Sequence, residues 1–137
     1  MAVLQTPEGI QVRALEVSDL AITNTAAANT ACTLTIPAAG TGLFHYITSI
    51  VIQRTATAAL AGSATLVITT TNLPGSMAFS VGNAMVAGGT QNDVNLSFAG
   101  NPLKSSVANT PTTVVCPAPG AAVLWRITVT YFAKAGV

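Results

Sequence analysis

The sequence predicts an all-β fold: a single-domain, jelly-roll-like antiparallel β-sandwich of about eight strands with an N-terminal arm. Three observations support this prediction. From residue 31 onward, short runs rich in Val, Ile and Thr are separated by turn residues roughly every 8–12 positions. No stretch combines a helical spacing of apolar residues with capping residues. No segment recurs at a fixed period, which argues against a propeller or a solenoid. An immunoglobulin-like sandwich is the alternative fold.

The beginning of the chain differs in composition from the rest. The chain has five basic and four acidic residues, and four of these charges lie in the first 19 positions. They are Glu8, Arg13, Glu16 and Asp19. We therefore expect residues 1–19 to form a polar arm that wraps a neighbouring molecule, or alternatively an edge strand over 10–17. Residues 20–137 would then form the sandwich domain.

The predicted strands follow one another with turns of Pro, Gly and Asn between them. They cover residues 32–36, 43–54, 64–71, 77–81, 94–98, 103–107, 112–116 and 123–132. Several of them are rich in β-branched residues, such as 64–71, or alternate apolar with polar residues, such as 32–36 and 94–98. The two longest strands, 43–54 and 123–132, are expected in the middle of the sheets. Residues 56–62 are expected to link two strands, with room for a helical turn, and 82–93 to form a glycine-containing loop.

The two faces of the strand "GLFHYITSIVIQRT" (42–55) do not separate into an apolar and a polar side. Strict alternation would place Phe44, Tyr46, Thr48, Ile50, Ile52 and Arg54 on one face. It would place Leu43, His45, Ile47, Ser49, Val51 and Gln53 on the other. A strand with water on one side should alternate cleanly. The mixed faces therefore predict that a partner covers the second face.

The last strand and the composition point to the same kind of interface. Only 7% of the residues are charged, whereas about 25% is typical, so uncharged side chains or partners must cover much of the surface. The outer face of 123–132 mixes hydroxyl, apolar and charged side chains. We predict a symmetric interface between subunits on these outer faces. Its predicted residues are Tyr46, Phe132, Thr128 and Thr130.

The composition argues against several other partners and locations. The net charge is +1 and no basic run is present, so we expect no nucleic-acid binding. The apolar runs are too short for a membrane-spanning helix, which argues against a membrane protein. The N-terminus lacks a basic start and an apolar core, so we expect no signal peptide and synthesis in the cytoplasm.

The residues that could carry chemistry are few. His45 has no acid, cysteine or second histidine nearby in the sequence, and Asp93 is the only acid after Asp19. We predict that Asp93 forms a structural ion pair with Arg54 or Arg126, because buried charges need a partner. No phosphate-binding or nucleophile motif is present. The expectation is therefore a protein without enzymatic activity, metal or cofactor.

The cysteines and aromatic residues leave two alternatives open. Cys32 and Cys116 are expected as buried free thiols, with a disulfide possible if the protein functions outside cells. A sugar-binding site would need exposed aromatic rings. Four of the seven aromatic residues, Trp125, Tyr131, Phe98 and Phe44, are expected in the core. The candidates for a sugar site are Tyr46, Phe79 and Phe132.

The stretches "GLFHYITSIVIQRTATAALAGSATLVITTTNLPG" (42–75) and "PAPGAAVLWRITVTYF" (117–132) resemble virion proteins of tailed bacteriophages. The chain looks like the jelly-roll decoration, or cement, proteins of phage capsids in length, low charge and strand composition. The resemblance implies a trimer that binds the major capsid protein across subunit junctions on the capsid surface, after assembly in the host cytoplasm. The charge of the arm suggests Glu8, Arg13, Glu16 and Asp19 as the capsid contact. The alternative is a carbohydrate- or receptor-binding module of a phage tail or fibre.

Overall fold

The computed structural model describes the fold of residues 4–5, 11–12, 19–98 and 100–136, with side chains from residue 19 onward. Strands β1 (Leu4–Gln5) and β2 (Gln11–Val12) pair antiparallel in a two-stranded sheet of their own. The charged residues Glu8, Arg13 and Glu16 lie outside the described residues, as does most of the alternative edge strand over 10–17. The division of the chain at residue 19 therefore stays a prediction.

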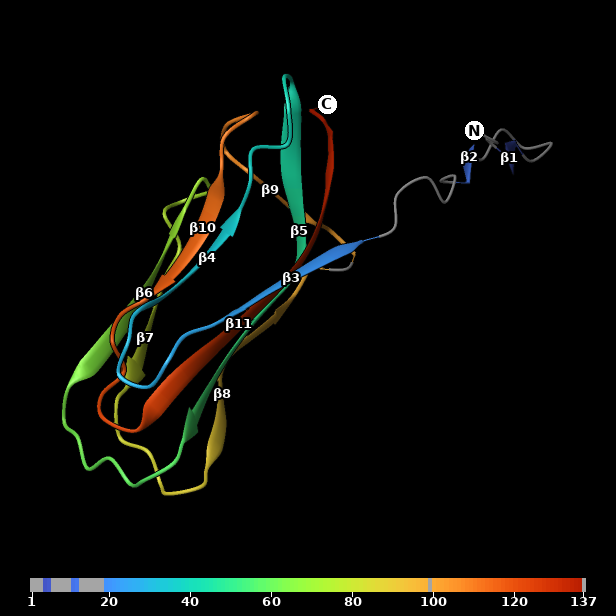
Figure 1. Ribbon diagram of the computed structural model, residues 1–137. Helices are drawn as coiled ribbons and strands as arrows, with labels where there is room; N and C mark the ends of the chain where they lie inside the picture. Colours follow the sequence, from blue (N-terminus) through green and yellow to red (C-terminus); the bar gives the residue numbers. More distant parts are fainter. Residues whose placement is uncertain (1–3, 6–10, 13–18, 99, 137) are drawn as a thin grey trace.

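The rest of the described chain is a β-sandwich, and the described residues include no helix. Its strands are β3 (Leu20–Thr25), β4 (Cys32–Ile36), β5 (Leu43–Ala56), β6 (Thr65–Thr71), β7 (Ala78–Gly82), β8 (Thr90–Ser97), β9 (Leu103–Lys104), β10 (Thr112–Cys116) and β11 (Val123–Ala135). One sheet has the order β4-β10-β6-β7. The other has the order β3-β11-β5-β8, and β9 also pairs with β5. Figure 1 shows the two sheets as facing layers, with β5 and β11 in the middle of the larger one.

The strand order is that of a jelly roll. When the short β9 is left out and the other eight strands are numbered along the chain, the sheets read 1-8-3-6 and 2-7-4-5. The first strand thus pairs with the last, the second with the seventh, the third with the sixth, and the fourth with the fifth. All four pairings are antiparallel. This is the pattern of a long hairpin, with its tip between β6 and β7, rolled into a sandwich. The predicted fold class is confirmed.

Most strand positions agree with the sequence prediction, and the differences have local causes. The segment 20–25 was not predicted, because as edge strand β3 it exposes nearly all of its residues and shows no buried face. Strand β8 begins at Thr90, inside the predicted loop. The segment 56–62 forms no helical turn, since Leu60 makes an isolated β-bridge with Met85.

The core lies between the two sheets and is built from alternate residues of each strand. Its buried side chains include Leu34, Ile36, Ile50, Ile52, Ile68, Val114, Trp125, Ile127 and Val129. Trp125 is fully buried, and its indole Nε1 donates a hydrogen bond of 2.7 Å to the carbonyl oxygen of Pro117. Tyr131 and Phe98 are partly buried against this core, as expected. Phe44 was expected in the core but lies on the outer face, because a bulge changes the phase of its strand.

This bulge, at Thr48, explains the mixed faces of strand β5. Ser49 pairs with Thr130 of β11, but the next pair is Ile47 with Tyr131, so Thr48 is an extra residue. An extra residue reverses the alternation of side chains beyond it. His45 and Ile47 are consequently buried between the sheets. Each half of β5 thus alternates between buried and outward-facing residues, and the bulge between the halves shifts the alternation by one residue. The mixed pattern in the sequence therefore does not by itself require a partner.

Candidate subunit interface and buried polar groups

The outer face of the five-stranded sheet carries all four residues that the sequence placed at a subunit interface. Thr128, Thr130 and Phe132 alternate with the buried residues of β11, and Tyr46 lies opposite Phe132 on β5. Phe132 is only 6% exposed and the other three are half-buried. The structure therefore brings the four together on one surface.

A network of hydroxyl groups runs across the middle of this face. The hydroxyl oxygens of Thr128 and Thr23 are 3.0 Å apart. The hydroxyl of Thr130 lies 2.8 Å from that of Thr48 and 2.5 Å from that of Ser49. The middle of this face carries no charge, and its hydroxyl groups are hydrogen-bonded to one another within the chain. Another surface could therefore cover it at little cost in desolvation.

An aromatic and cationic cluster occupies one end of the same face. The rings of Tyr46 and Phe132 stack, with centroids 5.1 Å apart and planes 2° from parallel. Lys104 Nζ lies 4.0 Å from the centroid of the Phe44 ring, a cation–π contact. Lys134 pairs with Phe44 across the β5–β11 ladder and is exposed. We call these five residues the aromatic–lysine patch.

Among the described residues, the charges are unevenly distributed over the surface. Lys104, Lys134 and Arg126 all belong to the outer face of the five-stranded sheet. Asp19, directly before β3, is the exposed acid of the described chain. The predicted pairing of Asp93 with Arg126 does not occur, because Arg126 is exposed on the outer face while Asp93 bonds to Arg54.

The ion pair between Arg54 and Asp93 is buried between the sheets. Arg54 Nε donates to Asp93 Oδ2 at 2.6 Å and Nη2 donates to Oδ1 at 2.7 Å, and neither side chain is exposed. The guanidinium carbon lies 5.2 Å from the centroid of the Trp125 ring. Asp93 is the extra residue of a bulge in β8, since Ile52 pairs with Val94 and Gln53 with Asn92. The bulge allows the carboxylate to reach inward.

His45 is also buried and bonded within the chain. Its Nε2 lies 2.9 Å from the carbonyl oxygen of Pro37, which can only accept, so Nε2 carries the proton. Its Nδ1 then accepts from the Thr112 hydroxyl at 2.8 Å. The Tyr131 ring packs edge-on against the imidazole at 5.7 Å. Burial lowers the pKa of His45, although the Pro37 carbonyl opposes this shift.

The two cysteines lie opposite each other in the four-stranded sheet. Cys32 of β4 pairs with Cys116 of β10, and both are buried and free. Burial raises the pKa of both thiols, that of Cys116 to about 12, where the nearby Cys32 and Asp93 contribute as well. The free thiols agree with the first of the two alternatives from the sequence.

The outer face of the four-stranded sheet differs from the other face because it carries no charged residue. Its outward-facing residues are Thr33, Thr35, Thr65, Val67, Thr69, Thr71, Ala78, Ser80, Gly82, Thr113 and Val115. Thr71 and Thr113 on neighbouring strands are hydrogen-bonded through their hydroxyls at 2.7 Å. On this face, threonine hydroxyls and not charged side chains provide the polar groups that contact water.

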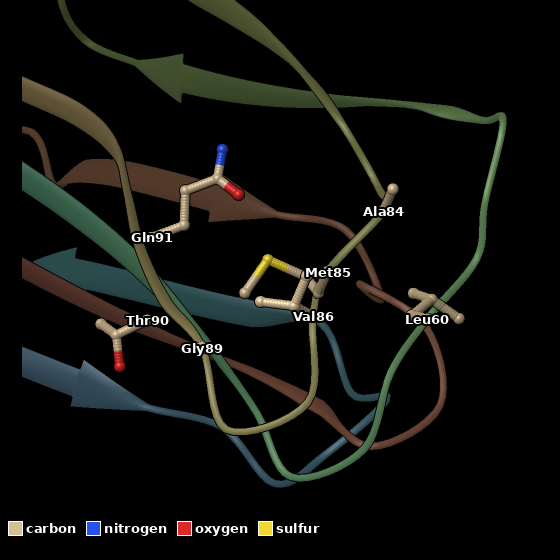
Figure 2. Close-up of a pocket in the computed structure, with 7 residues that line it drawn as sticks. All are labelled: Leu60, Ala84, Met85, Val86, Gly89, Thr90 and Gln91. Atoms are coloured by element: carbon tan, nitrogen blue, oxygen red, sulfur yellow. The ribbon is translucent and has the colours of Figure 1, made fainter.

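A pocket of about 470 Å³, which was not predicted from the sequence, lies at the loop end of the sandwich. Its lining residues are Leu60, Ala84, Met85, Val86, Gly89, Thr90 and Gln91. Figure 2 shows Met85 and Val86 between Leu60 on one side and Gln91 on the other. The lining carries no charged or catalytic group. The only sequence signal was the placement of Leu60 and Met85, two large apolar residues, within segments of small residues.

Two features are absent from the described residues. They contain no helix that is long and apolar enough to cross a membrane. They also contain no group of three or more His, Cys, Asp or Glu side chains placed to hold a metal ion.

Comparison with known proteins adds little to this geometry. No family model matches the chain, and no curated protein matches it. A solved structure of a virus-like particle of Macrobrachium rosenbergii extra small virus matches at 11% identity, over 88% of this chain and 82% of that chain, with a TM-score of 0.34. A structure of infectious bursal disease virus, Gx strain, matches at 12% identity and a TM-score of 0.23, over 97% of this chain but 45% of that one. These values are too low for either likeness to indicate the function of this chain.

Proposed function

We propose that the protein is a structural component of a virion, a capsid decoration or cement protein that acts as a homotrimer. The observation that carries the proposal is the outer face of the five-stranded sheet, where aromatic rings and mutually bonded hydroxyls lie on the two longest strands. Such a face can be covered by another subunit without leaving charges buried in its middle. The low charge of the chain agrees with a surface that is partly covered by partners.

In this role, the trimer sits on the capsid surface and binds the major capsid protein across subunit junctions. We assign the capsid contact to the arm, whose charged residues are Glu8, Arg13, Glu16 and Asp19. A ligand that binds only the assembled shell stabilises it by mass action, by about 4 kcal/mol per site at a thousandfold excess over Kd. Many sites on each shell multiply this effect. Assembly takes place in the host cytoplasm.

The proposal is for a role without enzymatic activity, nucleic-acid binding or a cofactor. His45 and Asp93, the side chains that an active site would need, are buried and bonded within the chain. The sugar-binding alternative is less favoured, because none of its three candidate rings is fully exposed: Phe132 is only 6% exposed, Phe79 is half-buried against the core, and Tyr46 is half-buried and stacked on Phe132.

Two measurements test the proposal. Size exclusion with light scattering, at several concentrations, should give a stable mass of three chains of 13.8 kDa each. Co-sedimentation with empty shells of a major capsid protein should then require the arm, with a chain lacking residues 1–19 as the control. A clean monomer would remove the main physical support for the proposal. A trimer that does not bind shells would contradict the decoration role.

A further inference from the structure

We propose that the pocket at the loop end of the sandwich binds a small, uncharged and mainly apolar molecule that carries one hydrogen-bonding group, such as an amide or a hydroxyl. Leu60, Met85 and Val86 supply the apolar contacts. Gln91 supplies the hydrogen bond. The inference goes beyond the proposed function and does not depend on it, because none of these residues was assigned to the subunit or capsid contacts.

The size and the lining of the pocket suit a small molecule. Its volume of about 470 Å³ falls within the range of about 300–1,000 Å³ of ligand sites, whose walls are mostly apolar with a few polar groups. Val86 is 73% exposed, the largest value among the exposed large apolar side chains of the described residues. A ligand that covers Val86 removes this apolar surface from water, which is favourable.

Backbone hydrogen bonds hold the walls of the pocket in place. The amide of Leu60 donates to the carbonyl oxygen of Met85 at 2.8 Å, and the amide of Met85 donates back at 2.9 Å. The following loop is fixed to β5, because Gly88 N donates to the carbonyl oxygen of Ala56 at 2.9 Å and Ala56 N donates to that of Gly89 at 3.0 Å. Met85 and Ala56 also belong to one small buried cluster, against which Leu60 packs. A site that is formed in advance binds its ligand without the cost of ordering a loop.

Gln91 is the polar side chain in the best position to orient a ligand. It pairs with Arg54 across the β5–β8 ladder, and Arg54 is buried between the sheets, so both side chains lie on the inner face of their sheet. Figure 2 shows Gln91 on one side of Met85 and Val86. Among the described residues, no hydrogen bond joins the Gln91 amide to another group of the chain. The amide offers an acceptor and two donors, so it can bond a ligand without breaking a bond of the fold.

The distribution of charge favours an uncharged ligand. The lining contains no charged residue. Arg54, opposite Gln91 in the ladder, is bonded to Asp93, and neither side chain is exposed. A charged group in this pocket would lose its water without gaining a counter-ion, which is costly. An apolar side chain of a partner protein is the other occupant that such a lining suits, but it makes no use of the amide of Gln91.

Methyl NMR of the full-length protein, labelled with ¹³C at the methionine methyl groups, tests the site. The probe is 2-naphthamide, which has an apolar body and one uncharged amide, and the matched control is 2-naphthoate, its anionic isostere. We expect 2-naphthamide to shift the methyl signal of Met85 in a saturable way, with a Kd on the order of 1 mM for a ligand of this size. The signal of Met77, which packs against the main core, should not move. 2-Naphthoate should bind at least about tenfold more weakly.

Variants test the assigned residues. Q91L should weaken the binding of 2-naphthamide about fivefold, as expected for the loss of one hydrogen bond. The matched control Q53L makes the same change on the outer face, where Gln53 donates to Asn92 Oδ1 at 2.7 Å, and should leave the Kd unchanged. A84F fills the pocket from an exposed position of its lining and should abolish binding. A urea midpoint close to that of the original protein shows that each variant is folded.

The outcomes separate this inference from its alternatives. The absence of a saturable shift at Met85, an equal shift at Met77, or equal affinity for the amide and the carboxylate would overturn the site. If A84F abolishes binding but Q91L does not weaken it, the assigned role of Gln91 is wrong, and an apolar side chain of a partner becomes the better occupant. The mass of the assembly plays no part in these measurements, so a failure here leaves the proposed function intact, and a monomer leaves the pocket intact.

Discussion

Replacing Arg54 with methionine would leave the Asp93 carboxylate buried without its counter-ion. Both side chains are fully buried, and two charge-assisted hydrogen bonds of 2.6 and 2.7 Å join them. Removing one partner of such a pair typically costs 3–5 kcal/mol, because the other charge stays desolvated. The same loss is expected for D93L alone. A domain of this size has about 5–15 kcal/mol of stability, so either change should remove a large part of it.

The double variant R54M/D93L should behave differently, because it removes both charges and leaves apolar side chains of similar volume. Its stability should lie within about 1 kcal/mol of the original protein or above it. The assay is urea unfolding followed by the fluorescence of Trp125, the single tryptophan, whose ring lies 5.2 Å from the guanidinium. With a slope of about 2 kcal/mol per molar urea, each single variant should shift the midpoint by about 2 M.

The double-mutant cycle makes this reasoning refutable. A coupling energy of about 5 kcal/mol or more is expected, because the two single losses of at least about 3 kcal/mol each are nearly absent from the double variant. Single variants that each cost under about 1 kcal/mol, or a double variant as unstable as the sum of the two, would show that the pair does not act as a desolvated unit.

Three further predictions concern other buried groups. Because the pKa of His45 is lowered in the folded state, the imidazole takes up a proton more readily in the unfolded chain. The free energy of unfolding should therefore be constant above pH 7 and should fall as the pH drops below about 6.5. The slope should be at most about 1.4 kcal/mol per pH unit. Urea midpoints at several pH values, with H45Q as the control that loses this slope, would measure it. Cys116 and Cys32, with raised thiol pKa values, should not react with Ellman's reagent at pH 8 until the protein is unfolded in urea; rapid reaction of the native protein would contradict their burial. Deleting Thr48 should turn His45 and Ile47 toward solvent and leave the chain insoluble or unfolded, whereas Thr48→Ala, which keeps the extra residue, should remain folded by circular dichroism.

Much of the fold could be predicted because the local signals agree with the structure. The segment 32–36 alternates regularly and 112–116 is rich in β-branched residues, and the structure has strands with those bounds. The long central strands combine β-branched residues with turn residues at both ends. Strand β3 was missed, since its stability comes from pairing with β11 and not from a buried face of its own. A pairing partner more than 100 residues away leaves no trace in a local pattern.

The candidate site was harder to predict, for a reason that β5 illustrates. The sequence placed Tyr46 on an outer face with Phe132, and the structure has them stacked there. It did not indicate the bulge at Thr48, because a bulge depends on the register between two strands and not on either strand alone. Phe44 was misplaced for the same reason. The two lysines beside it come from different strands, so their proximity follows only from the tertiary pairing.

The edge position of β3 also has a mechanical consequence. A pull on the arm enters the sandwich at Leu20 and meets the six residue pairs that join β3 to β11. When the pull runs along the strand, those pairs resist in shear and share the force, whereas a pull across the strand would open them one after another. β11 passes the force to β5 through thirteen further pairs. The attachment of the arm should therefore resist a pull along β3 more strongly than a pull across it, which would separate β3 from β11 one residue pair at a time.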